Sequence, residues 1–260
     1  MALAPVRADA SSWISCHLPN PTALIRLFCF PFAGGAASVY REWQTSLPQF
    51  VEVCPVQPPG RETRLAERPR AQLSTLIEEL SVNLAPLLDK PYALFGHSMG
   101  ALIAFEFARA SRRRGFAPPM HLFASGRRAP HVPPNKPHLH RLPDPEFLGR
   151  IRDYNGTPEE VLASAELMAI LLPVLRADFT MIETHHYVEE PPLPCDLSVL
   201  GGVDDAESAD GRLEAWARHA AGRFRLRLFP GGHFFPIDSR AEVLADLTAV
   251  LHTYVVPTNT

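Results

Sequence analysis

Cysteine is scarce in this chain of 260 residues, and no two cysteines are close in sequence. Cys16, Cys29, Cys54 and Cys195 form no CxxC motif, and two of them lie in apolar, strand-like stretches. Disulfide frameworks and structural zinc sites depend on closely spaced cysteines, so the sequence indicates neither. We therefore expect reduced cysteines and a cytoplasmic protein.

Long apolar runs and an excess of one charge are also missing. No run reaches the roughly 18 apolar residues of a membrane span, and residues 1–10 lack the apolar core of a signal peptide. The net charge is only -3, which gives no electrostatic reason to expect binding to nucleic acid or to a membrane. With 46% apolar and 20% charged residues, the chain can form a large globular core.

Cofactor and metal motifs are absent as well. The glycine pair Gly34-Gly35 belongs to neither a GxGxxG nor a GxxxxGK[ST] pattern, so we reject a nucleotide site. His185-His186 and the pair His138 and His140 have no HExxH context. We expect no cofactor and no metal.

Strand-like and helix-like stretches alternate along most of the sequence. Strand-like stretches occupy residues 24–30, 50–56, 92–95, 120–124, 197–200 and 224–229, and helix-like stretches occupy residues 74–88, 101–114, 212–219 and 240–254. Several strand-like stretches are apolar throughout, as in strands that are covered on both faces. The alternation predicts an α/β fold with a mainly parallel central sheet and helices on both faces.

The most informative motif is GHSMG at residues 96–100, between the strand-like stretch 91–95 and the helix-like stretch 101–108. A serine at a sharp strand-to-helix turn has a strained backbone, and the flanking glycines avoid collisions there. Ser98 is therefore the candidate nucleophile. The alternative is a flexible turn, but the flanking strand and helix signals favour a nucleophile elbow.

A serine nucleophile needs a base within hydrogen-bond reach. Among eleven histidines, only His233 lies in a glycine-flanked turn directly after the last strand-like stretch. Loops that follow parallel strands share one edge of the sheet, so His233 is the candidate base. The alternative is a histidine packed in its turn by Phe234 and Phe235. His97 adjoins Ser98 but would point away from it, which favours a packing role or a contact at the mouth of the substrate site.

The base in turn needs a carboxylate, and Asp204 and Asp205 follow the strand-like stretch 197–200. The chain order Ser98, Asp205, His233 is the order of an α/β hydrolase. Spacing alone does not choose between the two aspartates, and either could serve only in a turn or a helix cap.

Two backbone N–H groups are candidates for an oxyanion hole. Met99 would stand at a helix N-terminus, where N–H groups lack partners and the helix dipole is positive. Ala33 lies in the glycine-rich loop after the first strand-like stretch, where Gly34 and Gly35 allow the main chain to approach a reacting carbonyl.

No strand-like stretch occurs between residues 127 and 194. We therefore divide the chain into a core (1–126 and 195–260) and an insertion (127–194). After a proline-rich segment come helix-like stretches at residues 144–154, 157–163 and 165–184. Asp144-Pro145 and a capping box at residues 157–160 mark helix starts, and Pro173 predicts a kink or a break. We interpret the insertion as a helical lid over Ser98; the alternative is a structural decoration.

With these motifs located, the chain resembles the type II thioesterases, which are free-standing editing hydrolases of polyketide synthase and non-ribosomal peptide synthetase pathways. The resemblance runs from about Leu27 to Leu251. It rests on FPFAGG (30–35), QPPGRE (57–62), GHSMG (96–100), SGRRAP (125–130), LPDPEF (142–147), LRAD (175–178), GGVDD (201–205) and PGGHFF (230–235). The family's acid ends its GGxxD motif eleven positions before a tryptophan, which selects Asp205 ahead of Trp216. Ala206 replaces a proline that is frequent in the family.

The resemblance implies an α/β-hydrolase fold and a mechanism. Ser98 would attack an acyl thioester on the phosphopantetheine arm of an acyl or peptidyl carrier protein, His233 would take the serine proton, and Asp205 would hold His233. The N–H groups of Ala33 and Met99 would stabilise the oxyanion, and water would release a free acid. The partner would be the carrier protein of a modular synthase, and the enzyme is expected to be a monomer.

Other functions fit the same residues. A small-molecule carboxylesterase can use the same fold and triad, because the triad does not distinguish oxygen esters from thioesters. The chain could also be a non-catalytic carrier-docking module, although an intact serine, acid and histidine argue against it, or it could transfer the acyl group to a nucleophile other than water.

Overall fold

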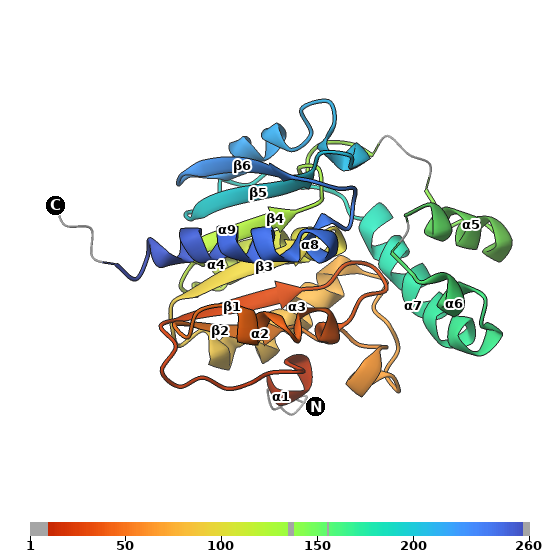
Figure 1. The fold of residues 1–260 in the computed structure, drawn as a ribbon, viewed down its shortest axis with the longest axis horizontal. Coiled ribbons are helices and arrows are strands. Elements are labelled where there is room, and N and C mark those ends of the chain that lie inside the picture. Colours follow the sequence, from red (N-terminus) through yellow and green to blue (C-terminus); the bar gives the residue numbers. More distant parts are fainter. Residues whose placement is uncertain (1–9, 135–137, 155, 257–260) are drawn as a thin grey trace, which may run out of the picture.

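The computed structural model describes residues 10–134, 138–154 and 156–256, and its centre is a six-stranded sheet (Figure 1). The strand order is β2-β1-β3-β4-β5-β6, and all neighbours pair in parallel. The strands are β1 (Ile25–Phe30), β2 (Val51–Pro55), β3 (Tyr92–His97), β4 (His121–Ser125), β5 (Asp196–Gly202) and β6 (Phe224–Phe229). Each overlaps a strand-like stretch of the sequence, so the predicted parallel sheet is confirmed.

Helices cover both faces of the sheet, as predicted. Alternate residues of a strand point to opposite faces. In β1, Phe28 and Phe30 join a cluster that includes residues of α3 (Leu73–Asn83) and α4 (Met99–Arg113). Leu27 and Cys29 join a second cluster, with residues of α2 (Trp43–Ser46) and α9 (Arg240–His252). The short helices α1 (Ala10–Trp13) and α8 (Phe235–Asp238) complete the core.

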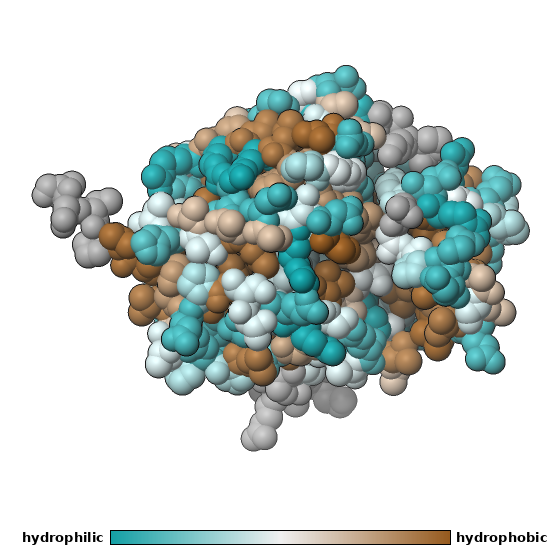
Figure 2. All heavy atoms as spheres, viewed as in Figure 1, coloured by the Kyte–Doolittle hydropathy of each residue, from teal (hydrophilic) through white to brown (hydrophobic). Residues whose placement is uncertain are grey.

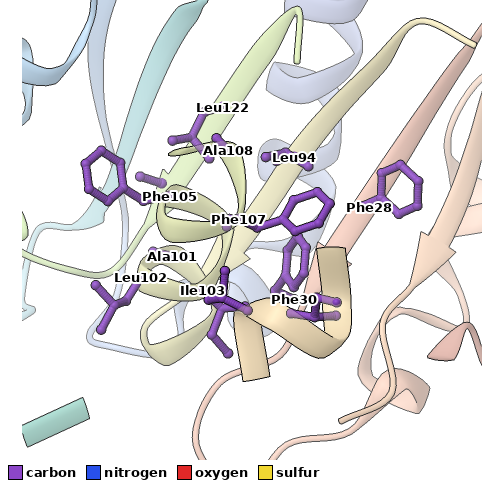
Figure 3. Close-up of a cluster of buried hydrophobic side chains, with 14 of the residues drawn as sticks. Phe28, Phe30, Leu94, Ala101, Leu102, Ile103, Phe105, Phe107, Ala108 and Leu122 are labelled. Carbon is purple, nitrogen blue, oxygen red and sulfur yellow. The ribbon is translucent and has the colours of Figure 1, made fainter. Parts of the chain in front are cut away.

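Helix α4 is the most deeply buried helix beside the sheet. Figure 3 shows its side chains facing those of β1, β3 and β4, and the Phe30 and Phe107 ring centroids lie 6.0 Å apart. Residues 99–111 of α4 are all buried, which is typical of a helix enclosed on every side. The core therefore fixes where α4 begins, and Ser98 immediately precedes it.

Two predicted helix-like stretches differ in detail from the structure. In the stretch 212–219, residues 214–219 form a 3-10 helix. Its buried residues Trp216 and His219 and its N-cap Leu213, which is also buried, are three positions apart, and the 3.0-residue turn of a 3-10 helix aligns them on one side. The helix predicted over 74–88 ends at Asn83, and a separate 3-10 turn (Ala85–Leu87) follows. Pro86 lacks the N–H that would continue the α-helix.

Among the residues that the structure describes between β4 and β5, the regular elements are three helices. They are α5 (Asp144–Tyr154), α6 (Glu159–Leu162) and α7 (Ala165–Glu183), grouped beyond one end of the sheet (Figure 1). Phe147 and Ile151 of α5 are buried against Met168 and Leu175 of α7, whereas the visible outer surface of α5 is largely hydrophilic (Figure 2). These helices thus share a small core of their own.

In this group the predicted capping box is absent, and of the two outcomes predicted for Pro173, a kink or a break, the break does not occur. The capping box predicted at residues 157–160 does not form, because Pro158 is the N-cap of α6 and no side-chain cap bond is made. Helix α7 also continues through Pro173 without a break. The carbonyl that Pro173 leaves without a partner belongs to Ala169, which is exposed, so water can satisfy it.

The close packing at the start of α4 yields a stability prediction. A Cβ atom on Gly100 would lie 2.0 Å from the carbonyl oxygen of Phe30, and neither backbone can easily move. We expect Gly100→Ala to lower the free energy of unfolding by about 3 kcal/mol or more, measured by denaturant titration.

The matched control for that substitution is Gly149→Ala. Gly149 lies in α5 with open space around its Cβ position, and alanine favours a helix over glycine by about 1 kcal/mol. We expect this variant to be as stable as the wild type or more so. A Gly100→Ala protein of wild-type stability would contradict the packing argument.

Candidate active site

Ser98 lies at a strained turn between β3 and α4. Its φ is 54° and its ψ is -111°, a backbone conformation that residues other than glycine rarely adopt. The turn is tight because a Cβ atom on Gly96 would lie 2.0 Å from the Gly100 carbonyl oxygen. The Ser98 N–H donates to the Ser125 carbonyl at 2.8 Å, which fixes the turn to β4. The local geometry is that of the predicted elbow.

His233 reaches Ser98 from the loop after β6. Its Nε2 lies 3.0 Å from the Ser98 Oγ, and its Nδ1 lies 2.8 Å from the Asp205 Oδ2. The ring therefore bridges the serine and the carboxylate. These three residues are far apart in sequence, and the ends of β3, β5 and β6 bring them to one edge of the sheet.

The structure distinguishes the two candidate aspartates. Asp205 is buried, and its second oxygen, Oδ1, accepts the Glu207 N–H at 3.0 Å. Asp204 is exposed, and its backbone N–H donates to the Gly231 carbonyl at 3.0 Å. Asp205 is thus the aspartate that the fold brings to His233, and its cap bond keeps the carboxylate in place.

Both residues predicted for the oxyanion hole lie beside Ser98. Met99 is the first residue of α4, so its N–H has no partner inside the helix. Ala33 lines the same pocket as Ser98. The contact between Gly100 and the Phe30 carbonyl brings the loop that carries Ala33 close to the start of α4.

A buried ion pair anchors the glycine-rich loop next to Ala33. The Asp178 carboxylate on α7 accepts two bonds from the Arg61 guanidinium, at 2.8 and 2.9 Å, and one from the Gly34 N–H at 2.8 Å. Arg61 also donates to the Gly35 carbonyl at 3.1 Å. The pair therefore ties the loop to α7. The segments 57–62 and 175–178 contribute to the family resemblance, but the sequence alone indicated no role for them. Arg61 and Asp178 are 117 positions apart, and a contact over that separation leaves no local signal.

His97 lies behind the reacting groups. It is buried, and its ring centroid is 5.1 Å from that of His233. Its Nδ1 lies 3.0 Å from the Ser125 Oγ. Burial, reinforced by the neighbouring His233, holds the pKa of His97 well below its ordinary value, so the ring is neutral at pH 7. A neutral, packed ring agrees with the packing role expected from the sequence.

A pocket opens at Ser98 and extends under the helices that follow β4. Apolar side chains from α5 and α7 line one side, among them Ile151, Leu175 and Phe179. Phe32 and Phe234 flank the reacting residues. The polar lining includes Arg127 and Arg128, directly after β4. The pocket thus combines an apolar chamber with a charged wall.

The described residues contain one cluster with the geometry of a metal site, formed by His17, Glu52 and Cys54. Glu52 is already paired with Arg26 at 2.9 Å, and burial raises the pKa of the Cys54 thiol far above its ordinary value. A cation there would compete with Arg26 and would meet a protonated thiol. The paired histidines of the sequence, His185 and His186, belong to no such cluster within the described part of the chain.

Within the same described ranges, no helix is both long and apolar enough to cross a membrane.

The anchor of the glycine-rich loop yields a second stability prediction. Asp178→Asn removes the charge that compensates buried Arg61, whose side chain is 7% exposed. Removing one partner of a buried pair typically costs about 3–5 kcal/mol. We expect Asp178→Asn to lower the free energy of unfolding by that amount.

The control is Glu159→Gln, because Glu159 pairs with Arg152 at the surface, where both side chains are more than half exposed. Equal effects of the two substitutions would show that the buried pair is not an anchor.

Comparison with known proteins agrees with this geometry. The model of the thioesterase domain family matches residues 25–251. Linear gramicidin dehydrogenase LgrE of Brevibacillus parabrevis is 44% identical over 249 residues, which cover 95% of each chain. Thioesterase PikA5 of Streptomyces venezuelae is 37% identical over 245 residues, which cover 94% of this chain and 87% of PikA5.

Solved structures give the same result. The type II thioesterase BorB from the borrelidin biosynthetic cluster is similar with a TM-score of 0.83 and 36% identity, over 94% of this chain and 98% of BorB. The predicted α/β-hydrolase fold and the resemblance to type II thioesterases are therefore confirmed. From the match over residues 25–251, the chain belongs to the thioesterase domain family.

Proposed function

We propose that this protein hydrolyses acyl thioesters held on the phosphopantetheine arm of acyl or peptidyl carrier proteins, and so removes stalled or aberrant acyl groups from a modular synthase. The observation that carries the proposal is the His233 ring, which bridges the Ser98 hydroxyl and the Asp205 carboxylate at hydrogen-bond distance. PikA5 is named a thioesterase and BorB a type II thioesterase, and these names support thioesters as the substrate class.

In the first half of the reaction, Ser98 Oγ attacks the thioester carbonyl while His233 Nε2 takes the hydroxyl proton. Asp205 accepts the Nδ1–H bond of His233, which keeps Nε2 free to act as the base and stabilises the ring once it is charged. The negative oxygen of the tetrahedral intermediate would accept hydrogen bonds from the Ala33 and Met99 N–H groups. The carbon–sulfur bond then breaks, and the thiol leaves with the proton from His233.

In the second half, His233 takes a proton from water, and the resulting hydroxide attacks the acyl-serine carbonyl. The carbon–oxygen bond to Ser98 breaks, the serine regains its proton from His233, and a free acid leaves. A thiol leaves more readily than an amine, so proton donation contributes less than the oxyanion hole and the position of the substrate.

Residues 127–194 act in this proposal as a lid that forms the acyl chamber. In its support, Ile151 of α5 and Leu175 and Phe179 of α7 line the pocket at Ser98. Apolar side chains there suit an acyl chain and exclude water from the acyl-enzyme until a single molecule attacks. The hydrogen bond from the Gly34 N–H to Asp178 also links this lid to the loop of the oxyanion hole.

Two other functions have less support. The name of LgrE denotes a dehydrogenase, but the serine, histidine and aspartate gathered here have no part in hydride transfer. A small-molecule carboxylesterase would use the same residues, and it is distinguished by substrate. It predicts faster cleavage of soluble oxygen esters than of acyl-carrier thioesters.

The role of Ser98 is tested with Ser98→Ala and an acyl group loaded on a carrier protein. Without the nucleophile, we expect kcat to fall by about 10⁵-fold, while binding of the carrier is unchanged. Release of free acid is measured by mass spectrometry, which also detects transfer to any other nucleophile. Turnover by Ser98→Ala at the wild-type rate would contradict the mechanism.

The role of Asp205 is tested against its neighbour. Asp205→Asn keeps the shape of the side chain but favours the wrong tautomer of His233, so we expect kcat to fall by about 10⁴-fold. The matched control, Asp204→Asn, changes an exposed carboxylate one position away and should retain wild-type kcat. A larger loss for Asp204→Asn than for Asp205→Asn would reverse the assignment.

A further inference from the structure

Arg127 is a charged residue of the pocket that the proposed mechanism does not use. It stands two positions after Ser125, whose carbonyl accepts the Ser98 N–H at 2.8 Å. The Trp216 indole N–H donates to the Arg127 carbonyl at 2.8 Å, which fixes the backbone of Arg127. The backbone that carries the Arg127 side chain is therefore fixed, and the residue lines the same pocket as Ser98.

The Arg127 side chain is buried and is not held by a hydrogen bond or an ion pair to any described residue. The residue is 8% exposed and lines the pocket that contains Ser98. Its side chain makes no hydrogen bond or ion pair with any residue in the described part of the chain, and its Nε is fully enclosed. A buried guanidinium is normally paired, because burial removes the water that would solvate its charge.

The acidic groups that line this pocket are already engaged. Glu207 pairs with Arg128 at 3.2 Å. Glu183 accepts the Leu139 and His140 N–H groups at 2.8 and 2.9 Å and contacts the His140 ring at 2.5 Å. Neither carboxylate forms an ion pair with Arg127.

The charge of Arg127 nevertheless persists at neutral pH. Burial, and then the neighbouring charge of Arg128, lower the pKa of Arg127 to about 10, and the charge of Glu207 opposes this shift, so Arg127 stays protonated. Burial also lowers the pKa of nearby His185 to about 4, with a further contribution from Arg127, so that ring is neutral and supplies no charge. The pocket thus holds a permanent cation with unused hydrogen-bond donors.

We propose that Arg127 binds an acceptor oxygen that the substrate carries close to its thioester. This inference rests on the proposed thioesterase function and adds a substrate preference to it. Two parts of the substrate can supply the oxygen, namely an oxygenated acyl chain, such as one with a β-oxo group, and the first amide carbonyl of the phosphopantetheine arm. The phosphate of the arm is at its far end from the thioester, whereas Arg127 lines the same pocket as Ser98.

The planar guanidinium suits this task. Its parallel N–H donors match the oxygens of a carbonyl, hydroxyl or carboxylate, and the apolar wall of α5 and α7 accepts the rest of the chain. A buried site with unmet donors discriminates strongly against a substrate that lacks the matching acceptor. Arg127 is therefore a specificity residue, separate from Ser98, Asp205 and His233.

The test compares wild type with Arg127→Met on four soluble thioesters. Butyryl and acetoacetyl groups, which differ by one β-oxo oxygen, are each joined to N-acetylcysteamine, which has the amide, or to butanethiol, which lacks it. We expect Arg127→Met to lower kcat/KM at least tenfold for substrates with the recognised oxygen and less than twofold for butyryl butanethioester. A loss that follows the β-oxo group assigns the acyl chain, and a loss that follows the amide assigns the arm.

Two further measurements keep the proposal falsifiable. Arg127→Lys retains the charge without the planar fork and should give an intermediate loss on the same substrates. If neither variant folds, as judged by its thermal unfolding, the wild type alone is decisive. Its kcat/KM, divided by the rate of hydroxide-catalysed hydrolysis, should then be at least tenfold higher for an oxygen-bearing substrate than for butyryl butanethioester.

The outcomes that would overturn the proposal are equal losses on all four thioesters, no loss on any of them, or a wild type without the tenfold preference. Failure of the thioesterase function gives a different result. In that case the wild type hydrolyses none of the four thioesters, or Ser98→Ala hydrolyses them as fast as the wild type does.

Discussion

The active site depends on the close packing of α4 against β1 and β3. Gly100 touches the Phe30 carbonyl and Gly96 touches the Gly100 carbonyl, so a methyl group at either position would collide with backbone. In the turn between β3 and α4, beside this packing, Ser98 has a positive φ of 54°. The buried core shown in Figure 3 stabilises that arrangement. The favourable packing of the core thus offsets the strain in the Ser98 backbone.

A second constraint is electrostatic. The Arg61–Asp178 pair connects the glycine-rich loop after β1 with α7, so the loop of the candidate oxyanion hole and the helical insertion share one buried contact. Arg127 differs, because it is a buried cation whose side chain forms no hydrogen bond or ion pair with a described residue. The charge of Arg61 is balanced within the protein, and we propose that the charge of Arg127 is balanced by the substrate. Arg61 therefore has an anchoring role beside the pocket, whereas Arg127 lines the pocket itself.

The sequence predicted the sheet, the main helices and the positions of Ser98 and His233, because each carries a local signal in apolar runs or glycine-flanked turns. It could not choose between Asp204 and Asp205 without the family resemblance, because the choice depends on how one loop folds against another. The roles of Arg61 and Asp178 were missed for the same reason. The segment 157–160 shows the reverse error, because its capping-box pattern does not form a cap bond in the structure.

The central claim is that Ser98 carries the acyl group during turnover, and covalent labelling tests it most directly. The wild-type protein is mixed with an excess of acyl-carrier thioester, quenched in acid within milliseconds, digested, and examined by mass spectrometry. The account predicts a peptide with the mass of the acyl group added at Ser98, formed and lost at rates consistent with turnover. An acyl group found on a different residue would contradict this account. So would free acid that forms at the full rate while no acylated peptide is detected in the pre-steady-state phase.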